Sequence, residues 1–224
     1  MFREVPGEWL EKVYISESYY NKKKHDSDMT GISYEIVQDN VFKAVSDTMT
    51  PQGILCVVRQ PVYDAGELLD KARPCFLLLE DIQDPGNLGT IMRTAEAAGV
   101  DAVIMSRGCV DIFNPKVIRS TMGAVYRVPF LYEDNLEQFV QRLKERNIEV
   151  YAAHLQDSVD YDSISYQKGC AFLIGNEGNG LSEALSSAAT GYIKIPMQGK
   201  VESLNAAVAA SVLVYEVYRQ RRRL

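Results

Sequence analysis

Residues 76–99 read FLLLEDIQDPGNLGTIMRTAEAAG, which predicts a buried strand followed by a capped helix. Phe76 to Glu80 is apolar up to its final glutamate, a pattern typical of a strand that is buried on both faces of a parallel sheet. The turn from Asp84 to Asn87 can cap the next helix, and Gly99 can end it. The side chains predicted to face the core are Leu88, Ile91, Met92 and Ala95.

The alternation of strand and helix continues toward the C-terminus and predicts a parallel sheet with helices on both faces. Further strands are expected at Ala102–Met105, Tyr126–Phe130, Glu149–Ala153, Ala171–Ile174 and Tyr192–Ile195. Helices are expected from Asn114-Pro115, over Asn135–Arg146, from Ser182 and over Ser203–Arg219, with Ser203 as an N-cap. The last helix is apolar on several faces, so we expect it to contact the core on one side and a partner subunit on the other.

Residues 1–58 are predicted to form a separate small α/β unit. Strands are expected at Trp9–Ile15, Ser33–Val37 and Ile54–Val58, with a polar helix reaching about His25 and a second helix at Asp39–Ser46. That second helix would present Val41, Phe42 and Val45 on one face. The unit is short and lacks an opening helix to cover one face of its sheet. Residues 59–73 are interpreted as a linker, and residues 74–224 as the main domain.

Composition excludes several classes of protein. A net charge of −6 argues against a surface coated with basic residues, although Lys22–Lys24 and Arg219–Arg223 form local groups that are usually solvated. No apolar run is long enough for a membrane helix, and the N-terminus lacks an apolar secretion segment, so a cytoplasmic protein is expected. Four separate cysteines and two histidines predict buried free thiols and disfavour a metal site.

Three polar, glycine-containing segments stand where predicted strands end and helices begin. They are Asn87–Arg93, Gly175–Ser182, and Ile195–Met197 followed by Glu202–Asn205. In open α/β sheets, ligands bind at such strand ends. The second segment has the spacing Gly-x-x-Gly-x-Gly and comes late in the chain, which disfavours a nicotinamide site, and no Walker phosphate loop is present. Gly199-Lys200 predicts a mobile loop that brings a cation to the cleft.

Each polar residue also has an ordinary structural interpretation. Asn87 can be a helix cap, Arg93 an exposed surface residue and Glu177 a solvated carboxylate. The glycines of the second segment can serve a tight turn. Three such segments in one domain are nevertheless hard to explain by turn chemistry alone.

In this order, the three segments resemble the motifs of the SpoU/TrmH family of RNA 2′-O-ribose methyltransferases. The resemblance covers residues 75–220 and rests on Asn87-x-Gly89-x-x-x-Arg93, on the segment from Gly175, and on Ile195-Pro-Met197 with Glu202-Ser-Leu-Asn205. It implies a C-terminal trefoil knot, which general rules of topology would not propose. It also implies a homodimer with a shared active site, no metal, and an N-terminal RNA-binding domain similar to a ribosomal protein.

The resemblance further implies where the chemistry occurs. A ribose 2′-OH would attack the sulfonium methyl group of S-adenosylmethionine, a reaction in which positioning dominates. Arg93 would orient the adjacent phosphate and stabilise the developing alkoxide, because a guanidinium stays protonated. The implied catalytic positions are Asn87, Arg93, Glu177, Ser203 and Asn205, and the implied cofactor-binding positions are Gly175, Ile195, Met197 and Leu204.

The function expected from the sequence is therefore methyl transfer from S-adenosylmethionine to a ribose 2′-OH of structured RNA, preferably ribosomal RNA. Transfer RNA is an alternative substrate. A non-catalytic RNA-binding or ribosome-assembly protein of the same fold is a second hypothesis, and it predicts poor cofactor binding. A small-molecule α/β enzyme with a nucleotide cofactor is a third, and the missing nucleotide fingerprints argue against it.

Overall fold

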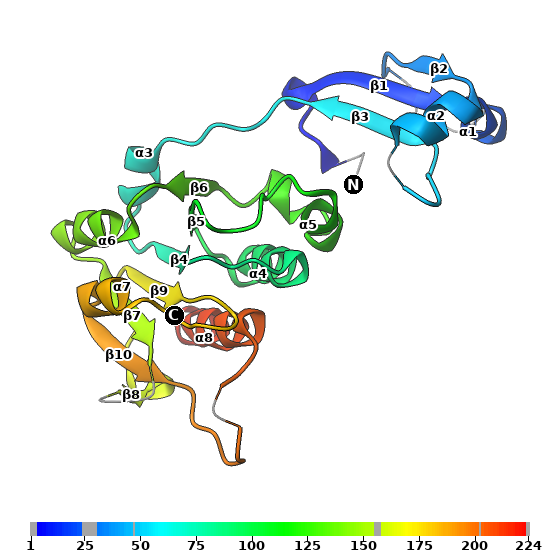
Figure 1. The fold of residues 1–224 in the computed structure, drawn as a ribbon. Coiled ribbons are helices and arrows are strands. Elements are labelled where there is room, and N and C mark those ends of the chain that lie inside the picture. The colour runs from blue at the N-terminus through cyan, green and yellow to red at the C-terminus, as the bar shows by residue number, and fades with distance from the viewer. Residues whose placement is uncertain (1–3, 24–30, 47, 155–157, 202, 223–224) are drawn as a thin grey trace. The chain divides into compact units, whose positions relative to one another are not determined.

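The computed structural model describes residues 4–23, 31–46, 48–154, 158–201 and 203–222. The chain divides into two compact units, residues 1–62 and residues 63–224. Each unit has its own sheet, and the elements of both are labelled in Figure 1.

The small unit is a three-stranded sheet in the order β2-β1-β3. β1 (Leu10–Ser16) pairs in parallel with β2 (Glu35–Val37) and antiparallel with β3 (Ile54–Val58). The short 3-10 helix η2 (Gly7–Trp9) precedes β1, and α1 (Glu17–Lys23) and α2 (Asp39–Val45) complete the unit. These elements match the predicted ones, except that the predicted end of the first helix lies outside the described residues.

The three apolar residues predicted to share one face of α2 differ in burial. Phe42 is 2% exposed, whereas Val41 and Val45 are 46% and 58% exposed. Successive helical residues lie about 100° apart around the axis, so Val41 and Val45 form a row beside Phe42 rather than in line with it. This two-turn helix contacts the sheet through Phe42 and leaves the neighbouring row open.

The large unit contains a seven-stranded sheet in the order β6-β5-β4-β9-β7-β10-β8, in which every pair of neighbours is parallel. Its strands are β4 (Cys75–Leu79), β5 (Ala102–Ser106), β6 (Phe130–Glu133), β7 (Glu149–Ala153), β8 (Val159–Asp160), β9 (Cys170–Ile174) and β10 (Gly191–Lys194). β4 and β9 are buried along their whole length. They pair in register from Cys75 opposite Cys170 to Leu79 opposite Ile174.

Helices cover both faces of this sheet, which confirms the predicted fold class. α4 (Pro85–Ala98), α5 (Pro115–Ser120) and α8 (Ala206–Arg221) pack on one face with Leu77 and Leu79 of β4. α3 (Ala65–Leu69), α6 (Leu136–Glu145) and α7 (Glu183–Ala188) pack on the other with Phe76 and Leu78. The β4 residues that contact the two groups of helices alternate along the strand, because successive strand side chains point to opposite faces.

Local signals placed most helix ends correctly. All four predicted core residues of α4 are fully buried, Asp84 caps this helix by accepting a hydrogen bond from the Asn87 N–H, and Gly99 ends it at φ 74°. The side chains of Asn114, Asn135 and Ser182 cap α5, α6 and α7 in the same way.

Two boundaries differ from the predictions. Residues 124–126 form the 3-10 turn η4 (Ala124–Tyr126) after Gly123 at φ 91°, and the strand expected at 126–130 lies instead at Phe130–Glu133, where it pairs with β5. α8 begins at Ala206 with Asn205 as its cap, so Ser203 is not the N-cap.

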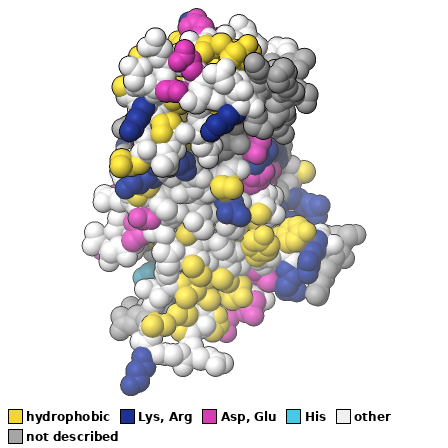
Figure 2. All heavy atoms as spheres, turned by 90° about the vertical axis from the view of Figure 1, so that its right-hand side faces the viewer, with side chains coloured by type: hydrophobic (Ala, Val, Ile, Leu, Met, Phe, Trp, Pro, Cys, Tyr) yellow, Lys and Arg dark blue, Asp and Glu magenta, His cyan; other side chains and the backbone are white. Residues whose placement is uncertain are grey.

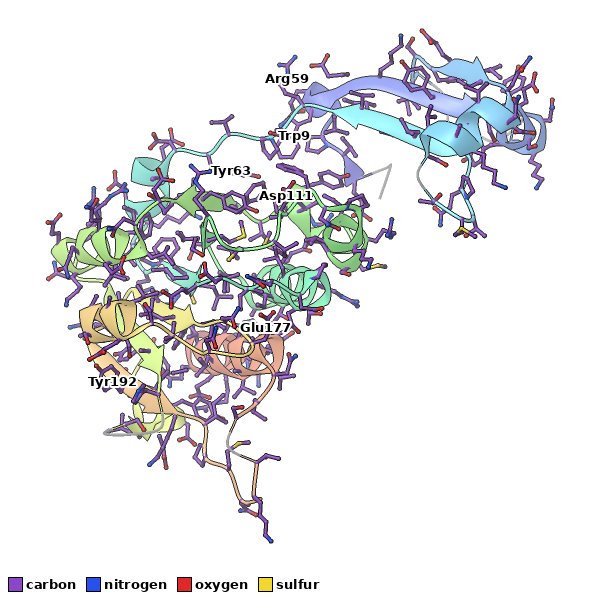
Figure 3. All side chains as sticks on the ribbon, in the orientation of Figure 1. Trp9, Arg59, Tyr63, Asp111, Glu177 and Tyr192 are labelled. Atoms are coloured by element: carbon purple, nitrogen blue, oxygen red, sulfur yellow. The ribbon has the colours of Figure 1, made fainter. Side chains whose placement is uncertain are left out.

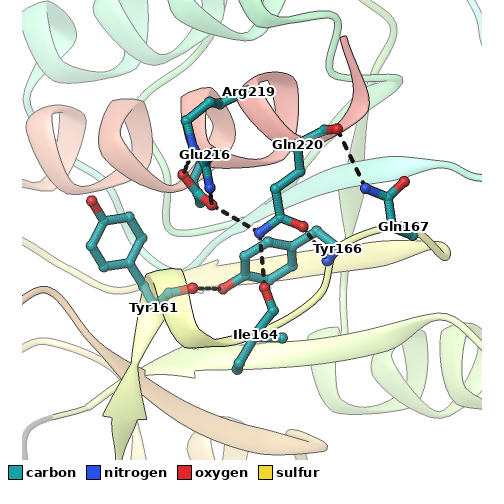
Figure 4. A network of polar contacts seen from close by, with 7 residues as sticks. All are labelled: Tyr161, Ile164, Tyr166, Gln167, Glu216, Arg219 and Gln220. Atoms are coloured by element: carbon teal, nitrogen blue, oxygen red, sulfur yellow. Dashed lines mark hydrogen bonds and ion pairs between the residues drawn. The ribbon is translucent and has the colours of Figure 1, made fainter. Parts of the chain in front are cut away.

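The C-terminal half of α8 is held by polar contacts (Figure 4). Glu216 is 7% exposed and accepts two hydrogen bonds from Arg219, at 2.6 and 2.7 Å. Gln220 donates to the Ile164 carbonyl and to the Glu216 carboxylate, and it accepts from the Tyr166 N–H at 2.9 Å. Arg221 donates to the backbone carbonyls of Arg73 and Lys168. Arg219 and Arg221 are therefore structural rather than simply solvated.

The cysteines are free thiols, as expected. Cys75, Cys109 and Cys170 are buried, and Cys56 is partly buried. The neighbouring Cys170 thiol and burial together raise the pKa of Cys75.

A glycine in α4 sets the distance between two helices. A Cβ atom on Gly89 would lie 2.2 Å from Cβ of Ser120 in α5. An unhindered Gly-to-Ala change inside a helix stabilises it by about 0.5–1 kcal/mol. We predict the opposite sign for Gly89→Ala, a loss of about 1–3 kcal/mol in the free energy of unfolding measured with urea, because the added carbon overpacks the contact.

The double variant with Ser120→Gly is expected to recover only part of this loss. It removes the clashing Cβ, but the Ser120 Cα and carbonyl carbon remain 3.2 Å from the added atom. A Gly89→Ala protein more stable than the wild type would show that this contact does not limit the helix distance.

Candidate functional site

A chain of hydrogen bonds joins three of the sequence-predicted polar residues. Asn87 Nδ2 donates to Glu177 Oε1 at 2.9 Å, and Asn205 Nδ2 donates to Asn87 Oδ1 at 2.9 Å. The three residues come from the start of α4, the loop after β9 and the cap of α8, and Figure 3 shows Glu177 beside these helices. We call this group the Asn87–Glu177–Asn205 hub.

The carboxylate of Glu177 is held by donors on both oxygens. Oε1 accepts from the Asp84 N–H at 3.1 Å and Oε2 accepts from the Gln83 N–H at 3.2 Å, in addition to the Asn87 amide. Burial by itself raises the pKa of Glu177, but these hydrogen bonds outweigh it and lower the pKa below its ordinary value. Glu177 is therefore an ionised acceptor at neutral pH, and its role in the hub is to fix Asn87.

The Asn205 side chain both caps α8 and binds Asn87. Its Oδ1 accepts from the N–H groups of Ala207 and Val208 and so caps α8, while its Nδ2 reaches Asn87. The cap orients the amide, so its donor points toward Asn87. The position of the third motif relative to the first is thereby fixed by the start of α8.

Residues that the sequence did not single out hold the strand ends together. Glu80 accepts from the Ser182 N–H at 2.7 Å and from its hydroxyl at 2.6 Å. Asn176 donates from Nδ2 to the Asp81 carbonyl at 2.7 Å, and its Oδ1 accepts from the N–H groups of Gly178 and Asn179. Glu80 at the end of a buried apolar strand was the available signal, since a charge there needs partners.

Gly175 is required by a close backbone approach. A Cβ atom there would lie 2.2 Å from the Gly180 carbonyl carbon and 2.3 Å from the Leu181 nitrogen. Asn176 and Gly180 exchange two backbone hydrogen bonds, which closes the loop. The tight turn considered for these glycines is present, and it is also what carries Glu177 to the hub.

Arg93 is separate from the hub. It lies on α4 and is exposed, and its side chain makes no hydrogen bond or ion pair with any residue that the structure describes. Six residues after Asn87, it projects from a different side of the helix. The structure thus joins Asn87, Glu177 and Asn205 and leaves Arg93 available for a ligand.

The third motif lies in the loop between β10 and α8, and it meets the hub at Asn205. Ile195, Met197 and Leu204 are half-buried, Ser203 is exposed, and Glu202 lies outside the described residues. Residues 196–201 make no backbone-to-backbone hydrogen bond within the described chain. The loop offers half-buried apolar side chains next to backbone donors and acceptors, a set suited to a nucleoside-containing ligand.

Two other findings concern the described part of the chain. It contains no group of three or more His, Cys, Asp and Glu residues arranged to hold a metal ion. No helix in it is both long and apolar enough to cross a membrane.

Comparisons with known proteins identify the family to which both units are similar. The model of the SpoU rRNA Methylase family matches residues 74–215, and that of the RNA 2′-O ribose methyltransferase substrate binding domain matches residues 5–64. The 23S rRNA (guanosine(2553)-2′-O)-methyltransferase RlmP of Bacillus subtilis is 41% identical over 188 residues, which are 84% of this chain and 73% of the relative.

Two solved structures are also similar. The S-adenosylmethionine-bound rRNA methyltransferase from Sinorhizobium meliloti matches with a TM-score of 0.79 and 30% identity, over 96% of this chain and 81% of that chain. A structure described as concerning 2-OH methylation of C/U34 on tRNA matches with a TM-score of 0.61 and 30% identity, over 68% of this chain and 99% of that chain.

The lowered pKa of Glu177 makes the stability of the protein depend on pH. A carboxyl whose pKa is lowered by folding stabilises the protein above its unfolded pKa of about 4.3 and loses this effect as pH falls through the folded pKa. We expect Glu177→Gln to lower the free energy of unfolding at pH 7 by at most about 1 kcal/mol, because the residue is exposed.

The difference between this variant and the wild type should shrink as pH falls from 5 toward about 3 in urea unfolding. Glu145→Gln is the matched control, since that exposed carboxylate makes no hydrogen bond within the described residues. A difference for Glu177→Gln that stays constant with pH would contradict the role of the ionised form.

Proposed function

The chain belongs to the SpoU rRNA methylase family and is an RNA 2′-O-methyltransferase that uses S-adenosylmethionine. From this we propose that its substrate is ribosomal RNA of the large subunit. The observation that carries the proposal is the identity of 41% with a 23S rRNA enzyme over 84% of this chain. We therefore also expect the activity in the cytoplasm.

Transfer RNA is the less favoured substrate. The similar structure concerned with tRNA covers 68% of this chain, whereas the rRNA methyltransferase structure covers 96%. The small unit, which matches a substrate-binding model over residues 5–64, supports an RNA that needs a second contact region. We infer that this unit binds RNA and that the residues after β3 connect it to the methyltransferase domain.

The residues present fit the cofactor. Gly175, Ile195, Met197 and Leu204 would hold it, since they combine a close-packed glycine turn with half-buried apolar side chains. Nearby, residues 196–201 make no backbone-to-backbone hydrogen bond with another described residue. When bound, S-adenosylmethionine supplies an electrophilic methyl group on a sulfonium. We also infer the trefoil knot, supported by membership of the SpoU family. A crystal structure in which the loops can be traced and closed tests the knot.

The chain's own residues would position the RNA. Arg93, with no partner among the described residues, would bind the phosphate next to the target ribose and stabilise the oxyanion that develops as the 2′-OH loses its proton. Asn87, Glu177 and Asn205 would keep the loops in register, and Ser203 would contact the ribose or the cofactor. Recognition of a 2′-OH also separates RNA from DNA.

The function is tested with purified protein, S-adenosylmethionine carrying a labelled methyl group, and an unmodified 23S rRNA transcript. We expect saturable cofactor binding by calorimetry and transfer of label to a ribose 2′-OH. Arg93→Ala should bind the cofactor like the wild type and fold normally, but transfer methyl about 100-fold or more slowly.

Cofactor binding without transfer to 23S rRNA, but with transfer to tRNA, would reassign the substrate. No cofactor binding at all would favour the non-catalytic alternative. Retained turnover in Arg93→Ala would remove Arg93 from the mechanism.

We further propose a homodimer formed through α8. Val208, Tyr215 and Tyr218 are 48%, 46% and 41% exposed and recur at intervals of seven and three residues along this helix. An apolar row of this kind on a buried helix supports a partner on its open side.

Light scattering at micromolar concentration should give twice the chain mass of 25.1 kDa. Tyr215→Glu is expected to give a monomer with little methyl transfer, whereas Val62→Asp, at a 94% exposed apolar residue outside α8, should leave the mass at that of the dimer. A wild-type monomer that transfers methyl would disprove the shared active site.

A further inference from the structure

A groove in the large unit lies beside the hub and is not explained by it. It is lined by residues from the start of α4 and from α5, and its volume is about 420 Å³. The lining residues are Asp84, Pro85, Gly86, Lys116, Arg119 and Ser120. We call it the α4–α5 groove.

The groove is part of the same rigid frame as the hub. Asp84 lines the groove, its N–H donates to Glu177, and its side chain accepts from the Asn87 N–H at 2.8 Å. The close approach of Gly89 to Ser120 holds α5 against α4. Gly86 and Arg93 are seven residues apart and so lie on one side of α4. Arg93 therefore lies two turns along the helix side that lines the groove.

The groove carries two basic side chains, Lys116 and Arg119. Lys116 and Arg119 are exposed, and neither side chain makes a hydrogen bond or ion pair with any residue that the structure describes. Elsewhere, cations such as Arg107 and Arg142 are paired with carboxylates. The acidic lining residue, Asp84, is used as a helix cap. Two unpaired cations on a concave surface raise the local concentration of anions.

Figure 2 shows how Lys and Arg side chains in general are distributed on one face of the molecule. Lys and Arg side chains stand there in separate small groups and do not form a continuous basic surface. Because the chain has a net charge of −6, attraction of a polyanion requires local groups of cations.

We propose that Lys116 and Arg119 form a phosphate-binding site for the RNA backbone that flanks the methylated nucleotide. This inference rests on the proposed function and adds two residues to the motif positions. A lysine and an arginine three residues apart suit phosphate oxygens as a point charge and a fork of donors. Contacts of this type fix the position of the RNA without reading its sequence.

The test compares wild type with Lys116→Ala/Arg119→Ala on the 23S rRNA transcript. We expect the KM for RNA to rise about tenfold with kcat nearly unchanged. The slope of log Kd against log salt concentration should fall by about 1 to 2, because each lost phosphate contact releases about one counterion fewer. The affinity for S-adenosylmethionine should stay unchanged. Arg119→Lys, which keeps the charge, should retain most of the salt dependence.

Lys168→Ala is the matched control, since this exposed lysine lines a different groove near the opposite ends of β4 and β9. An unchanged KM and salt slope in the double variant, with normal turnover, would overturn the inference and leave the proposed function intact. A loss of S-adenosylmethionine affinity with unchanged RNA binding would also overturn it, because the groove would then serve the cofactor. If the wild type does not methylate 23S rRNA, the proposed substrate fails, and the salt slope on the same RNA still decides whether the groove binds phosphate.

Discussion

The parallel pairing of β4 with β9 is the constraint on which the rest of the large unit depends. It joins residues about a hundred positions apart, and both strands are buried along their whole length. Burial on both faces leaves no freedom to slip the register, because a shift by one residue would exchange the two core faces. Once this pair is set, the loops that follow the two strands must meet at the same edge of the sheet.

The meeting of those loops explains the polar residues at the edge. Glu80 binds the start of α7, and Asn176 binds the carbonyl of Asp81, so the loop after β9 is attached to the end of β4 by two independent contacts. These contacts are exposed and individually weak. Their effect is to position Glu177. In this position its carboxylate accepts hydrogen bonds from the N–H groups of the loop after β4 and from the Asn87 side chain.

The basic residues fall into two groups, those that are paired within the fold and those that have no partner among the described residues. Arg219 and Arg221 belong to a basic C-terminal run, yet Arg219 pairs with buried Glu216 one turn earlier in the same helix, and Arg221 donates to the backbone carbonyl of Arg73 outside the helix. Arg93, Lys116 and Arg119 are isolated in the sequence and lack partners among the described residues. The number of charges in a run is thus a poor guide to function here, because a charge already satisfied by the fold contributes little to binding an external anion.

Strand and helix periodicity determined most of the large unit, since its elements are apolar on defined faces and its helices are capped by Asp84, Asn114, Asn135 and Ser182. The order of motifs also determined the family and the polar positions of the hub. Sequence could not place Asn205 as the cap of α8 instead of Ser203, or the strand at Phe130–Glu133, because backbone φ angles and strand pairing choose between adjacent candidates. Only the tertiary structure decided that Asn87, Glu177 and Asn205 touch while Arg93 stands apart, because the insertion of β9 beside β4 is a long-range pairing that local patterns do not encode.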